Sequence, residues 1–210
     1  MSLGLRLQLR FLLLISLAAL GTAQGDSPSK QELLRNLRHG GYVILMRHAS
    51  SPRDPPNAAA AKAENTHLER QLDEAGQASA RAMGEALRRL RIPIGGVFAS
   101  PTYRALETIQ FAQLGHATTF PELGDGGQSM TADKTGSRAL WLKARVAERP
   151  SAGKNTIIVT HFPNIMEAYP QDIGGLSDGE ALILHPDGKG SASIVARVKI
   201  GDWAQLDKPG

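Results

Sequence analysis

A short apolar run that ends in an arginine and a histidine constrains this chain more than any other feature. The run extends from Tyr42 to Met46, follows two glycines, and leads directly into Arg47 and His48. Bounded by those glycines and by a polar, proline-rich segment, it predicts a strand buried on both faces of a parallel sheet. Ligands of open α/β sheets bind beyond the carboxyl ends of the strands. A guanidinium and an imidazole at that position suit an anion and a nucleophile.

The first 23 residues are predicted to be a secretory signal peptide. Arg6 and Arg10 form a basic start, residues 11–20 are apolar but too few to span a bilayer, and residues 21–23 are small, as cleavage requires. Residues 24–210 then form a single domain that we expect to be periplasmic or secreted, with no stable membrane insertion after cleavage. The sequence has no cysteine, so neither disulfides nor a lipoprotein anchor is expected.

The charge of the chain argues against a nucleic-acid partner. Removing the two leader arginines from 24 basic residues leaves 22 against 20 acidic residues, a net charge of +2. Lysine and arginine form no block, and aromatic residues make up 5% of the chain, so surfaces on which bases stack are scarce. The six histidines include no pair at the i, i+4 spacing of helical zinc sites, and we expect no metal and no cofactor.

Hydrophobic periodicity and capping residues predict strands that alternate with helices along the chain. The predicted strands cover residues 42–46, 97–99, 117–120 and 156–160, followed by a hairpin that pairs 180–185 with 192–199. The predicted helices run from a Ser29 cap to Arg38, from an Asp73 cap to a stop at Pro93, and over residues 101–111, 134–148 and 164–169. This alternation predicts an α/β fold, a three-layer sandwich in which helices cover both faces of a mainly parallel central sheet.

Three finer expectations follow from local chemistry. Ser100 is a predicted N-cap with Pro101 at the first helical position. Residues 49–71 are predicted to be a long loop with a helical turn around residues 58–63, and loops of this length are usually functional or mobile. In the helix at 134–148, the predicted buried face consists of Leu140, Trp141, Ala144 and Ala147.

Two histidines and two arginines are predicted to meet at one edge of the sheet. His48 and His161 each follow a strong strand, and Arg47 and Arg104 lie at junctions between strands and helices. Because parallel strands bring their carboxyl ends to one edge, all four side chains can converge there. A helix that starts near Pro101 adds free N–H groups and the positive end of a dipole. Together these groups suit a dianionic phosphoryl group.

In these residues the chain resembles the histidine phosphatase superfamily, in its phosphoglycerate mutase-like branch and as an exported bacterial type. The Ser-Pro-x-x-Arg-Ala-x-x-Thr stretch is the most specific part of the resemblance, which covers about residues 40–200 in the right order. The matching segments are residues 45–49, 72–76, 99–108 and 159–161. The resemblance implies a three-layer α/β fold and a mechanism that passes through a phosphohistidine.

The chain departs from the family pattern after the first histidine. The family usually has Arg-His-Gly, whereas Ala49 follows His48 here. A literal Arg38-His39-Gly40 occurs earlier, but it precedes the buried strand and would lie at the wrong edge of the sheet. We therefore assign the catalytic pair to Arg47 and His48.

The resemblance also implies a role for each site residue. His48 is the nucleophile, Arg47 and Arg104 hold the phosphoryl oxygens, and His161 donates a hydrogen bond, preferably as imidazolium. The family commonly places a general acid just after the third strand; Glu122 matches by position and is favoured, and Asp125 on the same loop is the rival. No metal is required, since cationic side chains supply the positive charge.

The remaining candidates have lesser expected roles. Those on the long loop that are expected to contact substrate are Asn65, Arg53 and Arg70. The histidines expected at the surface or in structural positions are His67, His116 and His185, and the aromatic residues expected in the core are Trp141, Phe162 and Trp203.

The predicted function is metal-independent hydrolysis of phosphomonoesters through a phosphohistidine on His48. A phosphohistidine or sugar-phosphate phosphatase of narrow specificity is a second interpretation. A phosphate-binding module without turnover is a third, because Ala49 and the two rival carboxylates leave it open. A mutase is disfavoured, because its usual metabolites are cytoplasmic and the chain is predicted to be exported. The expected partner in each case is a small phosphorylated molecule.

Overall fold

The computed structural model describes residues 28–125, 136–171 and 174–208. The predicted signal peptide lies outside these residues. Six strands form a single sheet: β1 (Val43–Arg47), β2 (Ile94–Ala99), β3 (Thr118–Thr119), β4 (Asn155–Thr160), β5 (Ala181–Pro186) and β6 (Ala192–Val198). The helices are α1 (Lys30–His39), α2 (Glu74–Arg89), α3 (Tyr103–Ala112), α4 (Ser137–Ala147) and α5 (Phe162–Ala168), with two 3₁₀ turns, η1 (Pro121–Leu123) and η2 (Asp202–Gln205).

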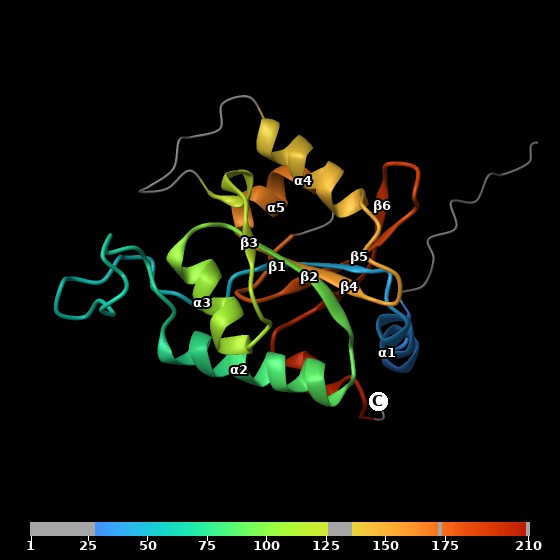
Figure 1. The fold of residues 1–210 in the computed structure, drawn as a ribbon, viewed down its shortest axis with the longest axis horizontal. Helices are drawn as coiled ribbons and strands as arrows, with labels where there is room; N and C mark the ends of the chain where they lie inside the picture. The colour runs from blue at the N-terminus through green and yellow to red at the C-terminus, as the bar shows by residue number, and fades with distance from the viewer. Residues whose placement is uncertain (1–27, 126–135, 172–173, 209–210) are drawn as a thin grey trace, which may run out of the picture.

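The sheet is mixed but mostly parallel, in the order β3-β2-β4-β1-β5-β6. Strand β1 pairs in parallel with β4, which pairs in parallel with β2, so the carboxyl ends of these three strands lie at one edge. The hairpin of β5 and β6 extends the sheet with antiparallel pairing. The predicted fold class and hairpin are therefore confirmed, and the segments after β1, β2 and β4 are neighbours in space (Figure 1).

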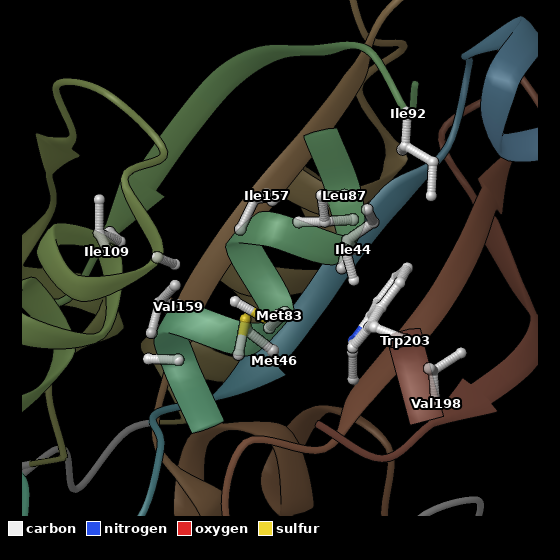
Figure 2. Packing of buried hydrophobic residues seen from close by; sticks show 14 of the residues in the cluster. Ile44, Met46, Met83, Leu87, Ile92, Ile109, Ile157, Val159, Val198 and Trp203 are labelled. Carbon is white, nitrogen blue, oxygen red and sulfur yellow. The ribbon is translucent and has the colours of Figure 1, made fainter. Parts of the chain in front are cut away.

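Helices cover both faces of the sheet because the central strands are apolar on both sides. On β1, Ile44 and Met46 belong to one buried cluster, and Val43 and Leu45 belong to the other. The first cluster packs against α1, α2 and α3, and Figure 2 shows Ile44 and Met46 beside Met83 of α2. The second cluster packs against α4 and α5, which lie on the opposite side of the sheet from α2 and α3 in Figure 1. Strands β1 and β4 are therefore packed on both faces, which fixes the positions of the residues at their carboxyl ends.

Local capping chemistry explains where the first two helices begin and end. Ser29 caps α1, because its hydroxyl accepts the backbone N–H of Glu32 at 3.3 Å, and Gly40 ends this helix with a φ of 81°. Asp73 caps α2, because its carboxylate accepts the N–H of Gly76 at 2.7 Å. A turn at Asn57, whose carboxamide oxygen accepts the N–H of Ala60 at 2.9 Å, corresponds to the turn predicted on the long loop.

Two local predictions were wrong. The residue that caps α3 is Thr102 rather than Ser100, since the Ser100 hydroxyl accepts the N–H of Thr102 and the helix begins two residues later than predicted. Of the face predicted for α4, Ala147 is buried and Trp141 is half-buried, but Leu140 is 68% exposed and the other buried residues are Leu142 and Val146. The stripe through Leu142 and Val146, four residues apart, faces the sheet, so Leu140 and Ala144 turn outward.

The described residues contain no helix that is long and apolar enough to cross a membrane.

Trp203 is buried in the first cluster, as predicted for the core. Trp141 and Phe162 are half-buried against the second cluster. His67, His116 and His185 are exposed, as predicted.

Candidate active site

Three loops bring the predicted histidines and Arg104 together at the carboxyl edge of the sheet. His48 follows β1, and its backbone N–H donates to the carbonyl of Thr160 at 3.0 Å. His161 follows β4, and its ring centroid lies 5.3 Å from that of His48. Arg104 enters from the first turn of α3 and contacts both imidazoles. The predicted convergence of these three side chains is therefore present.

His48 is held in the tautomer that leaves Nε2 unprotonated. Its Nδ1 lies 2.7 Å from the carbonyl oxygen of Ala49, which accepts only from an N–H, so the proton is on Nδ1. Nε2 accepts a hydrogen bond from Nε of Arg104 at 3.2 Å. Thr108 fixes the loop beneath, because its hydroxyl oxygen accepts the N–H of Ala49 at 3.1 Å. The unprotonated nitrogen therefore faces the guanidinium.

The charge state of His48 follows from its surroundings. The side chain is 3% exposed, and burial, together with the positive charges of Arg104 and Arg47, lowers its pKa to about 3. The Ala49 carbonyl opposes this shift, because it favours the protonated ring. His48 is therefore neutral at physiological pH, which is the form that can attack an electrophile.

His161 is also neutral, which corrects the expectation of an imidazolium. Burial lowers its pKa well below the usual value, and Arg104 lowers it further. Its Nδ1 accepts from Nη2 of Arg104 at 3.1 Å, so its proton is on Nε2, which donates to the Ser100 hydroxyl at 2.9 Å. The same nitrogen lies 3.3 Å from the hydroxyl of Thr102. The Ser-Pro segment thus orients His161.

Arg104 is the centre of the cluster. Its guanidinium is buried and forms an ion pair with the carboxylate of Asp125. The same carboxylate oxygen lies 3.7 Å from Nδ1 of His161. One arginine therefore joins two imidazoles and a carboxylate, an arrangement that suits the binding of an oxyanion and the movement of a proton.

The structure brings Asp125, rather than the favoured Glu122, into this cluster. Glu122 lies within the short turn η1, and in the described part of the chain no hydrogen bond or ion pair joins its carboxylate to His48, Arg104 or His161. The turn ends at Leu123, and the chain then carries Asp125 over the guanidinium of Arg104. The rival carboxylate is therefore the one with the geometry of a proton donor.

Arg47 lies at the rim of the cluster. Its Nη2 pairs with Asp178 at 2.5 Å, and its Nη1 donates to the carbonyl of Leu176 at 3.1 Å. The guanidinium also lies 5.8 Å from the ring centre of Phe162, beside His161. Its charge also helps to lower the pKa of His48.

The candidates on the long loop differ in how near they lie to the cluster. The Arg70 guanidinium donates to the backbone carbonyls of Pro52 and Ser51 at 2.6 and 3.1 Å, and burial and the charges of Arg104 and Arg47 lower its pKa. The Asn65 carboxamide is used within its own loop, where it donates to and accepts from the backbone of Glu69 at 2.7 and 2.9 Å. Arg53 is exposed on the loop. We expect Arg70, rather than Asn65, to reach a substrate.

The sequence reasoning missed two residues that shape the site. Asp178 pairs with Arg47 across 131 positions of sequence, and no local pattern marks it. Asn164 donates to backbone carbonyls of the loop that carries Asp125. A polar residue three positions after a strand-ending histidine was the one available signal for Asn164.

The earlier Arg38-His39-Gly40 segment lies away from this cluster. His39 ends α1 at the opposite edge of the sheet, where its Nδ1 lies 2.8 Å from the carbonyl oxygen of Arg35. It lines a separate cavity with Gly40, Gly41 and His185. This placement agrees with the choice of Arg47 and His48 over Arg38 and His39.

The sequence of residues 43–124 matches the profile of the histidine phosphatase superfamily, branch 1. Over this segment the chain is similar to the superfamily. The matching segment runs from β1 through η1 and so contains both His48 and Arg104. This similarity supports an enzyme related to the histidine phosphatases.

Solved structures share the fold of this chain. A structure of the protein histidine phosphatase SixA complexed with tungstate is 19% identical, with a TM-score of 0.55 over 77% of this chain and 98% of that chain. YhfR from Bacillus stearothermophilus is 17% identical, with a TM-score of 0.52 over 74% and 95% of the two chains. No curated protein matches the sequence.

Proposed function

We propose that the protein is a metal-independent phosphatase that hydrolyses phosphomonoesters through a phosphohistidine on His48. The observation that carries the proposal is the neutral His48 ring, whose Nε2 lone pair faces the guanidinium of Arg104. The side chains of Arg104, Arg47 and Arg70 supply the positive charge that phosphoryl transfer requires. The similar SixA structure is complexed with tungstate, an oxyanion, which supports an oxyanion as the ligand here.

In the first step, the Nε2 lone pair of His48 forms a bond to phosphorus while the bond to the ester oxygen breaks. The Nδ1–H of His48 donates to the Ala49 carbonyl and stabilises the positive charge that develops on the ring. Arg104 moves its hydrogen bonds from the two imidazoles to the phosphoryl oxygens. His161, oriented by Ser100, lies beside the transferring group.

The second step regenerates the enzyme. A water molecule attacks phosphorus, the N–P bond breaks, and its electron pair returns to Nε2 of His48. A carboxylate accepts the proton of the attacking water, and inorganic phosphate leaves. The carboxylate that protonated the leaving oxygen in the first step is deprotonated and can serve as this base.

Asp125 fits the role of proton donor because its ion pair can change with substrate. Without substrate its carboxylate pairs with Arg104, which favours the ionised form. A dianionic phosphoryl group that takes over the guanidinium leaves the carboxylate beside a negative charge, which favours its protonated form. Substrate binding would therefore favour a proton on Asp125, next to the departing oxygen.

The proposal is tested with purified protein that begins at Gln24 and a chromogenic phosphomonoester. We expect turnover of p-nitrophenyl phosphate that EDTA does not change and that tungstate inhibits competitively. Loss of activity with EDTA, restored by a divalent cation, would contradict the metal-independent mechanism. Tight phosphate binding without turnover would favour the binding module instead.

Replacement of the two rival carboxylates should distinguish the general acid. An alkoxide must be protonated as it departs, whereas nitrophenolate leaves well without a proton. Asp125→Asn should therefore slow hydrolysis of an alkyl phosphate by ~10²–10⁴-fold, the usual loss of acid catalysis, and slow p-nitrophenyl phosphate far less. The measurement is kcat/KM for both substrates, and Glu122→Gln is the matched control on the same loop.

The opposite pattern would reassign the role. A leaving-group effect confined to Glu122→Gln would give the acid to Glu122, as the family position implies. If neither variant discriminates between the substrates, the leaving group needs no acid from this loop. A phosphoramidate such as phosphohistidine would then become the better substrate class.

A further inference from the structure

Side chains next to His161 hold the loop that carries Asp125. Nδ2 of Asn164 donates to the carbonyl of Glu122 at 3.1 Å and to that of Gly124 at 2.8 Å. The hydroxyl of Thr160 donates to the intervening carbonyl of Leu123 at 2.6 Å. Three consecutive carbonyls are thus held by two residues that flank His161 in sequence.

We propose that Asn164 is a positioning residue that fixes Asp125 against Arg104 and His161. This inference rests on the proposed function, in which Asp125 transfers the proton. Asn164 is 3% exposed and lies in the first turn of α5, directly after the loop of His161. The same short segment therefore places an imidazole of the site and the carbonyls that lead into Asp125, so the distance between these two groups is set locally.

The chemistry of the contact requires a primary amide. Two carbonyl oxygens face one side chain, and an NH₂ group offers a hydrogen to each of them. Alanine at this position would leave both carbonyls without their donor, and the Gly124 carbonyl belongs to a buried residue. Serine can donate to only one of the two, so the loop would be held less firmly but not released completely.

Asn155, in the strand that precedes His161, is a matched control. It lies at the start of β4, where its Nδ2 donates to the carbonyls of Leu37 and Pro93 at 2.7 and 3.0 Å. It is buried and serves two carbonyls, as Asn164 does, but at the opposite edge of the sheet from His161. Its Oδ1 also accepts the backbone N–H of Tyr42 at 3.1 Å, so Asn155→Ala removes the same two Nδ2 donations and one further hydrogen bond without disturbing Asp125.

The test compares Asn164→Ala with Asn155→Ala on an alkyl and an aryl phosphate. Displacement of an acid by about 1 Å costs on the order of 10²-fold, so Asn164→Ala should lose about 10- to 100-fold more kcat/KM on the alkyl phosphate than on the aryl phosphate. Combined with Asp125→Asn, it should cause no further discrimination. Asn155→Ala should slow both substrates equally, and if Asn164→Ala does the same, the proposal is overturned.

Binding of inorganic phosphate supplies a readout that does not depend on turnover. Asp125 competes with an anion for Arg104, so Asp125→Asn should tighten phosphate binding severalfold in calorimetry. Asn164→Ala should shift the affinity in the same direction, and Asn155→Ala should not. If Asp125→Asn shows no leaving-group effect, the acid assignment fails, and this binding arm alone decides the positioning role. Asn164→Ser replaces Asn164→Ala in both arms if the alanine variant does not fold.

Discussion

His48→Ala is expected to abolish phosphatase activity while leaving the fold intact. The ring supplies the electron pair that bonds to phosphorus. In the described cluster, His48 is the imidazole whose N–H is held by a backbone carbonyl, whereas the N–H of His161 faces the Ser100 hydroxyl. Loss of a nucleophile typically costs on the order of 10⁴–10⁶-fold in kcat. The measurements are kcat on p-nitrophenyl phosphate and trapping of phosphoprotein by a denaturing alkaline quench. The trapped species should be alkali-stable, acid-labile and absent from the variant.

His39→Ala is the control for this experiment. His39 also follows an arginine and precedes a glycine, but it lies at the opposite edge of the sheet. Its removal should leave kcat nearly unchanged and should not affect phosphoprotein trapping. A variant at His48 that keeps more than a few per cent of activity, with an unchanged unfolding midpoint, would refute the nucleophile assignment. An inactive His39→Ala would instead support the motif that we rejected.

The central part of the site was predictable because it is built from strand ends. The apolar runs of β1 and β4 are visible in the sequence, and parallel pairing of these strands places His48 and His161 side by side. Arg104 follows β2 by a short connection and lies in the first turn of α3, so its position was also determined by local sequence. The positions of residues that follow strands ending at a common edge can be predicted with little knowledge of the tertiary structure.

The carboxylate was harder to assign because its position depends on distant contacts. Glu122 and Asp125 are three residues apart, and sequence position favours Glu122. Which of them turns inward is set by the turn η1 and by hydrogen bonds from Thr160 and Asn164, about 40 positions away. No local pattern around residue 122 carries that information.

The protonation state of His161 could not be predicted for a related reason. An imidazolium at His161 would suit an anion, and the sequence alone gives no measure of burial. The structure encloses His161 and places the guanidinium of Arg104 3.1 Å from its Nδ1, so both burial and like charge disfavour the proton. Positive charge at the site therefore comes from arginines, while both histidines remain neutral.

Arg104→Lys is expected to lower kcat/KM by about 10³-fold, because one guanidinium makes contacts that an ammonium cannot reproduce. Nε reaches His48 at 3.2 Å, while Nη2 reaches both His161 at 3.1 Å and Asp125. Lysine keeps the charge but lacks the planar fork that fits two phosphoryl oxygens. Loss of one preorganised donor to a developing negative charge costs ~10²–10³-fold in kcat. The measurement separates kcat from KM on p-nitrophenyl phosphate.

Arg89→Lys is the matched control, because Arg89 pairs with Asp207 and donates to the carbonyl of Ala204 at an exposed position far from the site. It should leave kcat and KM unchanged. In Arg104→Lys the fall should appear mainly in kcat, since the guanidinium leaves the imidazoles for the phosphoryl oxygens as charge develops on them. A rise in KM with kcat preserved would mean that Arg104 binds substrate and transition state equally. Stabilisation of the transferring group would then have to come from Arg47 and Arg70, and their variants would show the loss of kcat instead.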